Sequence, residues 1–288
     1  MIQNTAEHKR LQLTALGKED WRKWGPYLSE RQWGTVREDY SHNGDAWNYF
    51  PFEQSNARAY RWGEDGIAGI SDIYQRLCFS VALWNGKDSI LKERLFGLNN
   101  SQGNHGEDCK EYYFYLDNTP THSYMKYLYK YPQQEYPYQT LIQENQNRTP
   151  KDLEYELMDT GIFDNNEYFD VFIDYAKNSD SDILIKITLV NRSEKEAKIN
   201  VLPTLWFRNT WAWKDKKKQK PFIKHLEDRH DCSIVEATHP TLKNVTFYYE
   251  TPKESLFTNN ETNSQRLFRS KSSETYFKDG INTDRKSV

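Results

Sequence analysis

The chain has 288 residues, with 39 Lys and Arg against 42 Asp and Glu and a formal net charge of −3. This near balance excludes the single-sign field that draws a protein to nucleic acid or to an anionic membrane surface. Only 36% of the residues are hydrophobic, but 15% are aromatic, and one enclosed ring buries roughly 150–250 Å². We therefore expect a folded chain that binds neither nucleic acid nor membrane.

The three cysteines, Cys78, Cys109 and Cys232, form neither a disulfide framework nor a metal-ligand spacing. Among seven scattered histidines only His225 and His230 lie close together, without a cysteine or carboxylate in a standard zinc pattern. The N-terminal sequence MIQNTAEHKRLQL lacks the apolar segment of a secretory signal, and no apolar run reaches the length of a membrane-spanning helix. These features predict a cytoplasmic protein without metal or cofactor.

The stretch from residue 76 to residue 98 combines a strand pattern with a helix pattern. The run RLCFSVALW, which ends at Trp84, predicts a strand. The following DSILKERLFGL predicts one short helix, with Asp88 or Ser89 as its N-cap and Gly97 near its end.

Between residues 121 and 177 the pattern changes from helical to period two. A turn or two of helix is expected from Thr121 to Tyr131, and LEYELMDTGIF, from Leu153 to Phe163, predicts a strand. YFDVFIDYAK then predicts a half-buried strand with Asp170 and Asp174 on its polar face. Its apolar face carries Phe169, Val171, Ile173 and Tyr175.

The next two strands are expected to complete a run of three consecutive antiparallel strands. DILIKITLVNR and AKINVLPTLWF form them, joined by the polar turn NRSEKE, and the first places together Ile183, Ile185, Ile187 and Leu189. After a solvated lysine-rich loop from Trp213 to Pro221, period-two runs recur from Ser233 to Thr238 and from Asn244 to Glu250. So many short strands at this spacing predict a mainly β fold, a large antiparallel β-sandwich with a few short helices.

Two segments are unusually dense in charged and aromatic side chains: ERQWGTVREDY, from Glu30 to Tyr40, and YRWGEDGIAGISD, from Tyr60 to Asp72. Hydrolysis of a glycosidic bond needs two carboxylates that flank it, about 5–5.5 Å apart for retention or 6.5–9.5 Å apart for inversion. Each segment holds one adjacent carboxylate pair, Glu38–Asp39 or Glu64–Asp65, and neighbours on an extended strand point to opposite faces. Neither pair forms an acid–base couple by itself.

The arginines and aromatic rings of these segments leave two interpretations open. They can stack on sugar rings and hydrogen-bond sugar hydroxyls, or the arginines can pair with neighbouring carboxylates beneath a structural loop. The glycines of GEDGIAG lack the G-x-G-x-x-G spacing of a phosphate site and predict tight turns and close backbone approach instead. No G-x-S-x-G nucleophile motif occurs.

Longer strings give the chain a family resemblance from about Leu11 to Asn282. They are WRKWGPYLSERQWGTVREDYS, AWNYFP, ARAYRWGEDGIAGISD, LCFSVALWNGKDSILKERLFGL, GNHGEDCKEYYFYLDNTPTHSYMKYLYKYPQ and VLPTLWFRNTWAW. In these strings the chain resembles the N-terminal region of large bacterial glucosidase-like proteins of glycoside hydrolase family 63.

The resemblance implies an N-terminal β-sandwich followed by an (α/α)6 barrel, which carries both catalytic carboxylates of an inverting α-glycosidase. Residues 1–288 are then expected to form a single N-terminal sandwich domain of a larger protein, with residues 1–20 and 283–288 at its periphery. Such a domain is expected to be inactive alone and to pack against its own catalytic domain, which acts on a small saccharide, an α-linked glucoside.

Under this interpretation the dense segments face the catalytic domain or its substrate, and none of their residues is catalytic. The candidates are Arg31, Trp33, Arg37, Glu38, Asp39, Arg61, Trp62, Glu64 and Asp65. Three alternatives stay open: a purely internal ion network, a complete small enzyme that uses the carboxylates of the dense segments, and a stand-alone carbohydrate-binding module with exposed rings such as Trp33, Trp47, Trp62 and Trp211.

Overall fold

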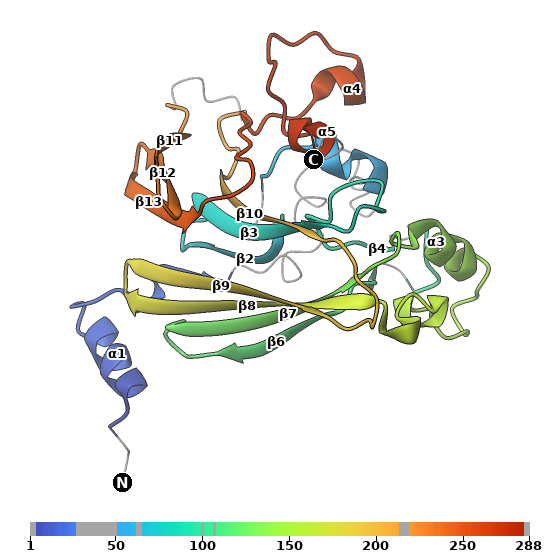
Figure 1. Ribbon diagram of the computed structural model, residues 1–288, viewed down its shortest axis with the longest axis horizontal. Coiled ribbons are helices and arrows are strands. Elements are labelled where there is room, and N and C mark those ends of the chain that lie inside the picture. The colour runs from blue at the N-terminus through green and yellow to red at the C-terminus, as the bar shows by residue number, and fades with distance from the viewer. Residues whose placement is uncertain are drawn as a thin grey trace. The chain divides into compact units, whose positions relative to one another are not determined.

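The computed structural model describes residues 4–26, 51–61, 65–98, 101–105, 108–212 and 219–284 (Figure 1). The chain divides into two compact units. Unit 1 takes its described residues from Met1–Phe52, Trp62–Gln75 and Phe79–Thr204, and unit 2 from Glu53–Arg61, Arg76–Cys78 and Leu205–Val288. The first dense segment and residues 213–218 of the lysine-rich loop lie outside the described residues.

Strands predominate in the described chain, where η denotes a short 3-10 helix. Up to residue 166 the elements are α1 (Ala6–Ala15), η1 (Trp21–Lys23), β1 (Trp24–Pro26), η4 (Phe52–Ala57), β2 (Ile67–Asp72), β3 (Leu77–Trp84), β4 (Gly97–Leu98), β5 (Asp108–Cys109), β6 (Tyr113–Asn118), β7 (Tyr124–Pro132), α3 (Tyr138–Gln146), η5 (Leu157–Thr160) and η6 (Asp164–Asn166). They are followed by β8 (Tyr168–Ser179), β9 (Asp182–Asn191), β10 (Asn200–Phe207), β11 (Phe222–Arg229), β12 (Cys232–His239), β13 (Leu242–Glu250), α4 (Ser264–Phe268) and α5 (Gly280–Asp284). With 39% strand and 18% helix, the mainly β prediction is confirmed.

Unit 1 contains a short two-stranded sheet of β4 and β5 and two four-stranded sheets that pack face to face, as Figure 1 shows. One has the order β6-β7-β8-β9 with antiparallel pairing throughout, and the other has the order β1-β2-β3-β10. The Tyr175 hydroxyl of β8 donates to the Ala68 carbonyl of β2 at 2.5 Å, and the Tyr175 ring lies edge-on to Phe79 of β3. These contacts join the inner faces of a β-sandwich.

The inner face of the β6-β7-β8-β9 sheet is rich in aromatic rings. Its buried side chains are Met125, Tyr127, Tyr129, Tyr131, Phe169, Val171, Ile173 and Tyr175. The predicted apolar face of β8 is therefore confirmed. Asp170, which was expected on a polar face, is also buried, because it pairs there with Lys130 at 2.7 Å and with Arg192 at 2.6 Å.

The expected run of three consecutive antiparallel strands is only partly correct. The strands β8 and β9 pair along their length, but β10 neighbours β3 in the other sheet. A period-two pattern shows which side chains share a face of a strand and leaves the neighbouring strand unspecified. The mostly polar residues 192–199 between β9 and β10 carry the chain from one layer to the other.

The predicted helix from Asp88 to Leu98 is wrong. This segment is extended, with isolated bridges from Leu83 to Lys92 and from Asp65 to Arg94, and it ends in β4. Residues 91–96 are all buried, so the segment has no polar face to present to solvent as an amphipathic helix would. The Asp88 carboxylate caps no helix and instead accepts hydrogen bonds in the core.

Two further predictions of local structure are wrong. The segment from Thr121 to Tyr131 mostly forms strand β7, whose alternate side chains fill the sandwich core. The predicted strand from Leu153 to Phe163 contains the 3-10 helix η5, which a reciprocal capping box of Glu156 and Asp159 begins and a left-handed Gly161 ends. Other described elements that were not predicted include helices α1, α3, α4 and α5 and strands β1, β2, β4, β5, β6 and β11.

Unit 2 contains the antiparallel sheet β11-β12-β13 and a small core of Tyr60, Cys78 and Trp206. The Tyr60 and Trp206 rings stack with their centroids 4.8 Å apart. The predicted strands at β12 and β13 are confirmed. No disulfide joins any of the three cysteines, all of which lie in the described part of the chain, and no described helix is long and apolar enough to cross a membrane.

Gly66 shows the close backbone approach that the sequence predicts for the second dense segment. Its φ is +86°, and a Cβ there would lie 2.1 Å from the Cβ of buried Ser80. Gly86 has a similar φ of +80° but open space around it. Substitutions at these two glycines therefore distinguish the cost of backbone strain, which both positions share, from the cost of steric overlap, which arises only at Gly66.

Gly66→Ala is expected to lower the free energy of unfolding by about 2–4 kcal/mol, because the methyl group meets Ser80 in addition to the left-handed strain. Gly86→Ala should cost about 1 kcal/mol through strain alone. Urea unfolding of both variants measures the difference. Equal losses would show that the Ser80 contact imposes no constraint.

Candidate functional site

Most candidate residues of the two dense segments lie outside the described residues. These are Arg31, Trp33, Arg37, Glu38, Asp39, Trp62 and Glu64. Of the remaining candidates, Arg61 is partly buried in unit 2 and Asp65 is buried in unit 1.

Asp65 lies in a buried ion pair of unit 1. Its Oδ1 accepts a hydrogen bond from the Arg94 Nε, and both side chains are about 95% buried, with exposed fractions of 5% and 4%. Glu93 lies 3.8 Å from the Arg94 guanidinium. The Asp65 carboxylate is therefore bound to a neighbouring cation in the interior, and proton transfer by it would leave Arg94 without this partner.

A second buried group centres on Glu111. Its Oε1 accepts from the Lys92 Nζ at 2.7 Å and from the Phe96 N–H at 3.1 Å, and its Oε2 accepts from the Tyr129 hydroxyl at 2.5 Å. The Lys92 ammonium also lies 3.9 Å from the centre of the Tyr136 ring. Burial, reinforced by Glu111, raises the pKa of Tyr129 well above its usual value, so this phenol stays protonated.

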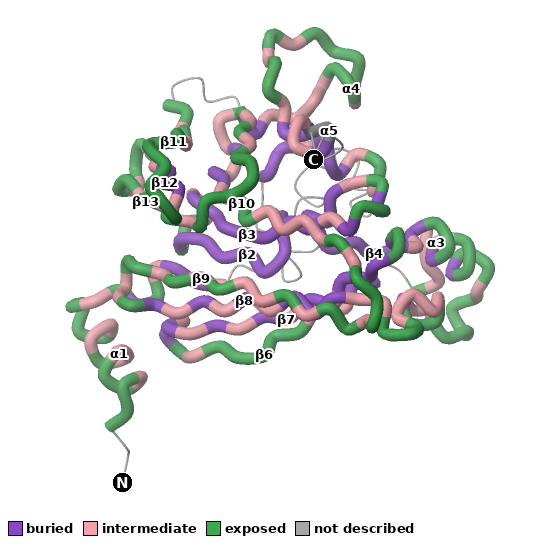
Figure 2. The backbone as a smooth tube through the Cα atoms, viewed as in Figure 1, coloured by how far each residue is buried: buried purple, intermediate pink, exposed green. Residues whose placement is uncertain are grey.

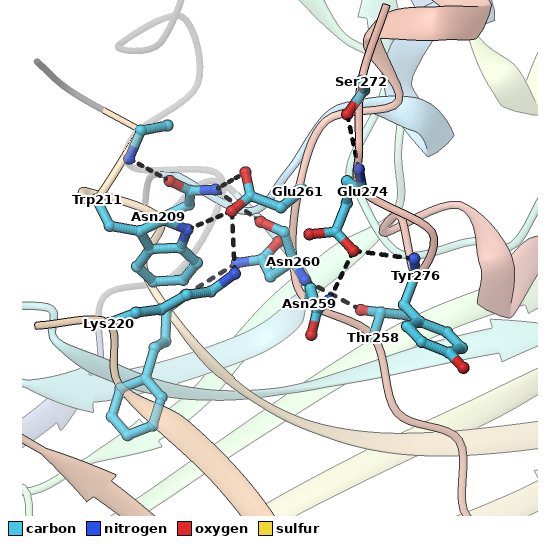
Figure 3. Close-up of polar contacts among 12 residues, drawn as sticks. Asn209, Trp211, Lys220, Thr258, Asn259, Asn260, Glu261, Ser272, Glu274 and Tyr276 are labelled. Carbon is cyan, nitrogen blue, oxygen red and sulfur yellow. Dashed lines mark hydrogen bonds and ion pairs between the residues drawn. The ribbon is translucent and has the colours of Figure 1, made fainter.

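Unit 2 contains a more open group of polar and aromatic side chains, shown in Figure 3. We call Asn209, Trp211, Lys220 and Glu261 the Trp211 site. The Trp211 indole Nε1 donates to the Glu261 Oε1 at 2.6 Å, and the Lys220 Nζ donates to the same oxygen at 3.0 Å. The Lys220 ammonium also lies 5.1 Å from the centre of the indole ring, which is partly exposed.

Asn209, which follows β10 and is fully buried, positions the carboxylate of the site. Its Nδ2 donates to the Asn260 carbonyl at 2.6 Å and to the Glu261 Oε2 at 3.3 Å. Its own N–H donates to the Tyr60 carbonyl at 2.8 Å, and its Oδ1 accepts from the Ala212 N–H at 3.2 Å. One amide side chain thus joins the turn that carries Trp211 to the segment that carries Glu261.

The Asn260 side chain fixes the same segment from its other side. It accepts from the Tyr60 N–H at 2.8 Å and donates to the carbonyls of Tyr60, at 3.1 Å, and Phe207, at 2.9 Å. Its φ of +48° is a left-handed conformation that asparagine tolerates better than most residues. The backbone of Glu261 is therefore held on both sides before any ligand binds.

Glu274 fastens the neighbouring chain segment, also shown in Figure 3. Its carboxylate accepts from the Tyr276 N–H at 3.0 Å and from the Asn259 Nδ2 at 2.7 Å, while its own N–H donates to Ser272 at 3.0 Å. The backbone hydrogen bond of Tyr276 and the Asn259 amide lower the pKa of Glu274. This carboxylate therefore stays ionised and braces the loop behind the Trp211 site.

The three groups differ in the chemistry they can support. Asp65 and Glu111 bind buried cations, whereas the Lys220 and Glu261 side chains are 39% and 24% exposed. Among the four residues of the Trp211 site, the sequence analysis named only Trp211, as an exposed ring. Asn209 and Glu261 lie about fifty residues apart, and no motif connects them. Among the described residues, no group of His, Cys, Asp and Glu could hold a metal ion.

No family model matches the chain, and no solved structure matches it. A curated protein of Saccharomyces cerevisiae, named uncharacterized protein YMR196W, is 46% identical to it over 313 aligned residues. The alignment covers 97% of this chain and 29% of the yeast protein. The chain therefore spans less than a third of the length of this curated relative.

Asp65→Ala is expected to lower the free energy of unfolding by about 3–5 kcal/mol, because it removes the carboxylate that pairs with the buried Arg94. Lys195→Ala is the matched control in unit 1, since this lysine is 76% exposed and pairs with Glu167 at the surface. Its cost should be about 0–1 kcal/mol. Urea unfolding measures both, and similar losses would contradict the structural role of Asp65.

Proposed function

We propose that this chain is a non-catalytic β-sandwich region of a glucosidase-like glycoside hydrolase that acts on α-linked glucosides, and that it packs against and supports a separate catalytic domain. The substrate class rests on the resemblance of the sequence strings to family 63. Two findings support the rest of the proposal. The fold is mainly β, and the yeast relative contains a region similar to this chain within a much longer polypeptide.

The observation that carries the supporting role is the apolar edge strand β6. It lies at one end of its four-stranded sheet, and Figure 2 shows it as largely exposed. Its successive residues Phe114, Tyr115 and Leu116 have exposed fractions of 40%, 43% and 45%. An exposed apolar edge strand favours association with another protein surface, and in the proposed hydrolase that surface belongs to the catalytic domain.

The buried carboxylates also support a role without bond cleavage. Asp65 and Glu111 are held by Arg94 and Lys92 inside unit 1. A general acid or base must reach the proton it transfers, within about 2.6–3.2 Å of the reacting group. Asp65 and Glu111, buried and paired with cations, are not placed to reach a substrate in this way.

The purified chain is expected to release no glucose from p-nitrophenyl α-glucoside or from α-linked disaccharides, because the proposed catalytic residues belong to another domain. It is also expected to self-associate with increasing concentration, because β6 is exposed when the catalytic domain does not cover it. Glucose release and sedimentation velocity measure the two outcomes.

Leu116→Lys should reduce the self-association, since a charge on an edge strand opposes pairing with another edge. Leu153→Lys is the control, because Leu153 is 85% exposed but lies outside β6. Clear hydrolysis by the purified chain would contradict the non-catalytic assignment. Self-association that Leu116→Lys leaves unchanged would contradict the assignment of β6 as the docking edge.

A further inference from the structure

The Trp211 site offers an aromatic ring whose position is set in advance. The indole Nε1 is held by Glu261 at 2.6 Å, and Asn209 holds the same carboxylate from its other oxygen at 3.3 Å. A ring fixed in this way loses little conformational freedom when a ligand packs on it. Pyranose rings present a face of C–H groups that packs on an aromatic ring, with hydroxyl groups around its rim.

The polar atoms beside the ring have hydrogen-bonding capacity left over. A lysine ammonium has three N–H donors, and Lys220 uses one of them for Glu261. An ionised carboxylate offers about four lone-pair sites, and Glu261 receives three donors, from Asn209, Trp211 and Lys220. A donor and an acceptor therefore lie side by side, the arrangement that two neighbouring sugar hydroxyls require.

Lys220 is the movable member of the site. Its side chain is 39% exposed, and it pairs with Glu261 and approaches the indole ring. The four-carbon stem of a lysine is flexible, so the ammonium can leave the ring for a hydroxyl while Glu261 stays held by Asn209 and Trp211. The ring face is then available to the ligand.

The charges of the site indicate the class of ligand. Lys220 and Glu261 form an ion pair whose formal charges cancel, so these two side chains together favour neither an anion nor a cation. We propose that the Trp211 site binds a neutral pyranose sugar, with the ring stacked on Trp211 and two neighbouring hydroxyls shared between Lys220 and Glu261. This binding site goes beyond the supporting role and is independent of β6.

The test is a calorimetric titration of the full 288-residue chain with maltotriose and with glucuronic acid. Maltotriose is expected to bind saturably and glucuronic acid more weakly. Trp211→Ala and Lys220→Met should each weaken maltotriose binding about tenfold, the effect of losing a stacking platform or a charged hydrogen bond. Tyr248→Ala, which removes a ring that is 60% exposed elsewhere in unit 2, should leave the affinity unchanged.

Thermal unfolding of each variant separates loss of binding from loss of structure. Lys220→Met replaces a partly exposed side chain and is expected to fold, so the proposal can be tested even if Trp211→Ala unfolds. The proposal is overturned if maltotriose does not bind, if Lys220→Met binds it as tightly as the original chain, or if glucuronic acid binds more tightly. None of these outcomes bears on the supporting role, whose test uses hydrolysis and self-association.

Discussion

The interior of unit 1 depends on tyrosines whose hydroxyl groups must find partners away from water. Tyr129, Tyr131 and Tyr175 are at most 2% exposed. Their hydroxyls donate to Glu111, Asp88 and the Ala68 carbonyl, each at 2.5 Å. A buried hydroxyl without a partner costs free energy, so a core built from these rings requires acceptors inside it. Burial raises the pKa of all three phenols, which keeps them protonated as donors.

This requirement explains why unit 1 buries the carboxylates of Asp88 and Glu111. Asp88 accepts from Tyr131 and from the Tyr136 N–H, and Glu111 accepts from Tyr129 and Lys92. A buried carboxylate in turn needs donors or a cation near it. The segment from residue 88 to residue 96 supplies both, and it remains extended because its charged side chains face inward. The burial of Asp88 and Glu111 therefore follows from the burial of tyrosine hydroxyls in this core.

In unit 2, buried asparagine side chains provide the hydrogen-bond partners of buried backbone groups. Asn209 and Asn260 bond to backbone groups of Tyr60, Phe207 and each other, and so join three separate chain segments. Their contacts leave Glu261 facing a partly exposed ring and a partly exposed lysine. Asn209 and Asn260 thus both hold the interior of unit 2 together and position the partly exposed Trp211 site. In the proposed hydrolase, unit 1 contributes the apolar edge that docks, and unit 2 contributes a surface suited to a neutral sugar.

The sequence by itself determined the mainly β class, the apolar face of β8 and the positions of β3, β12 and β13, because alternation along one strand is a local property of the chain. Only the tertiary structure decided that β10 joins β3, that residues 88–96 are extended and that Trp211 meets Glu261. Each of these depends on partners distant in sequence. Trp211 and Glu261 are 50 residues apart, and Tyr129 and Glu111 are 18 apart. Buried polar groups need hydrogen-bond partners, and the folded interior brings such partners together from distant parts of the chain. The spacing of residues along the sequence does not show which groups will meet.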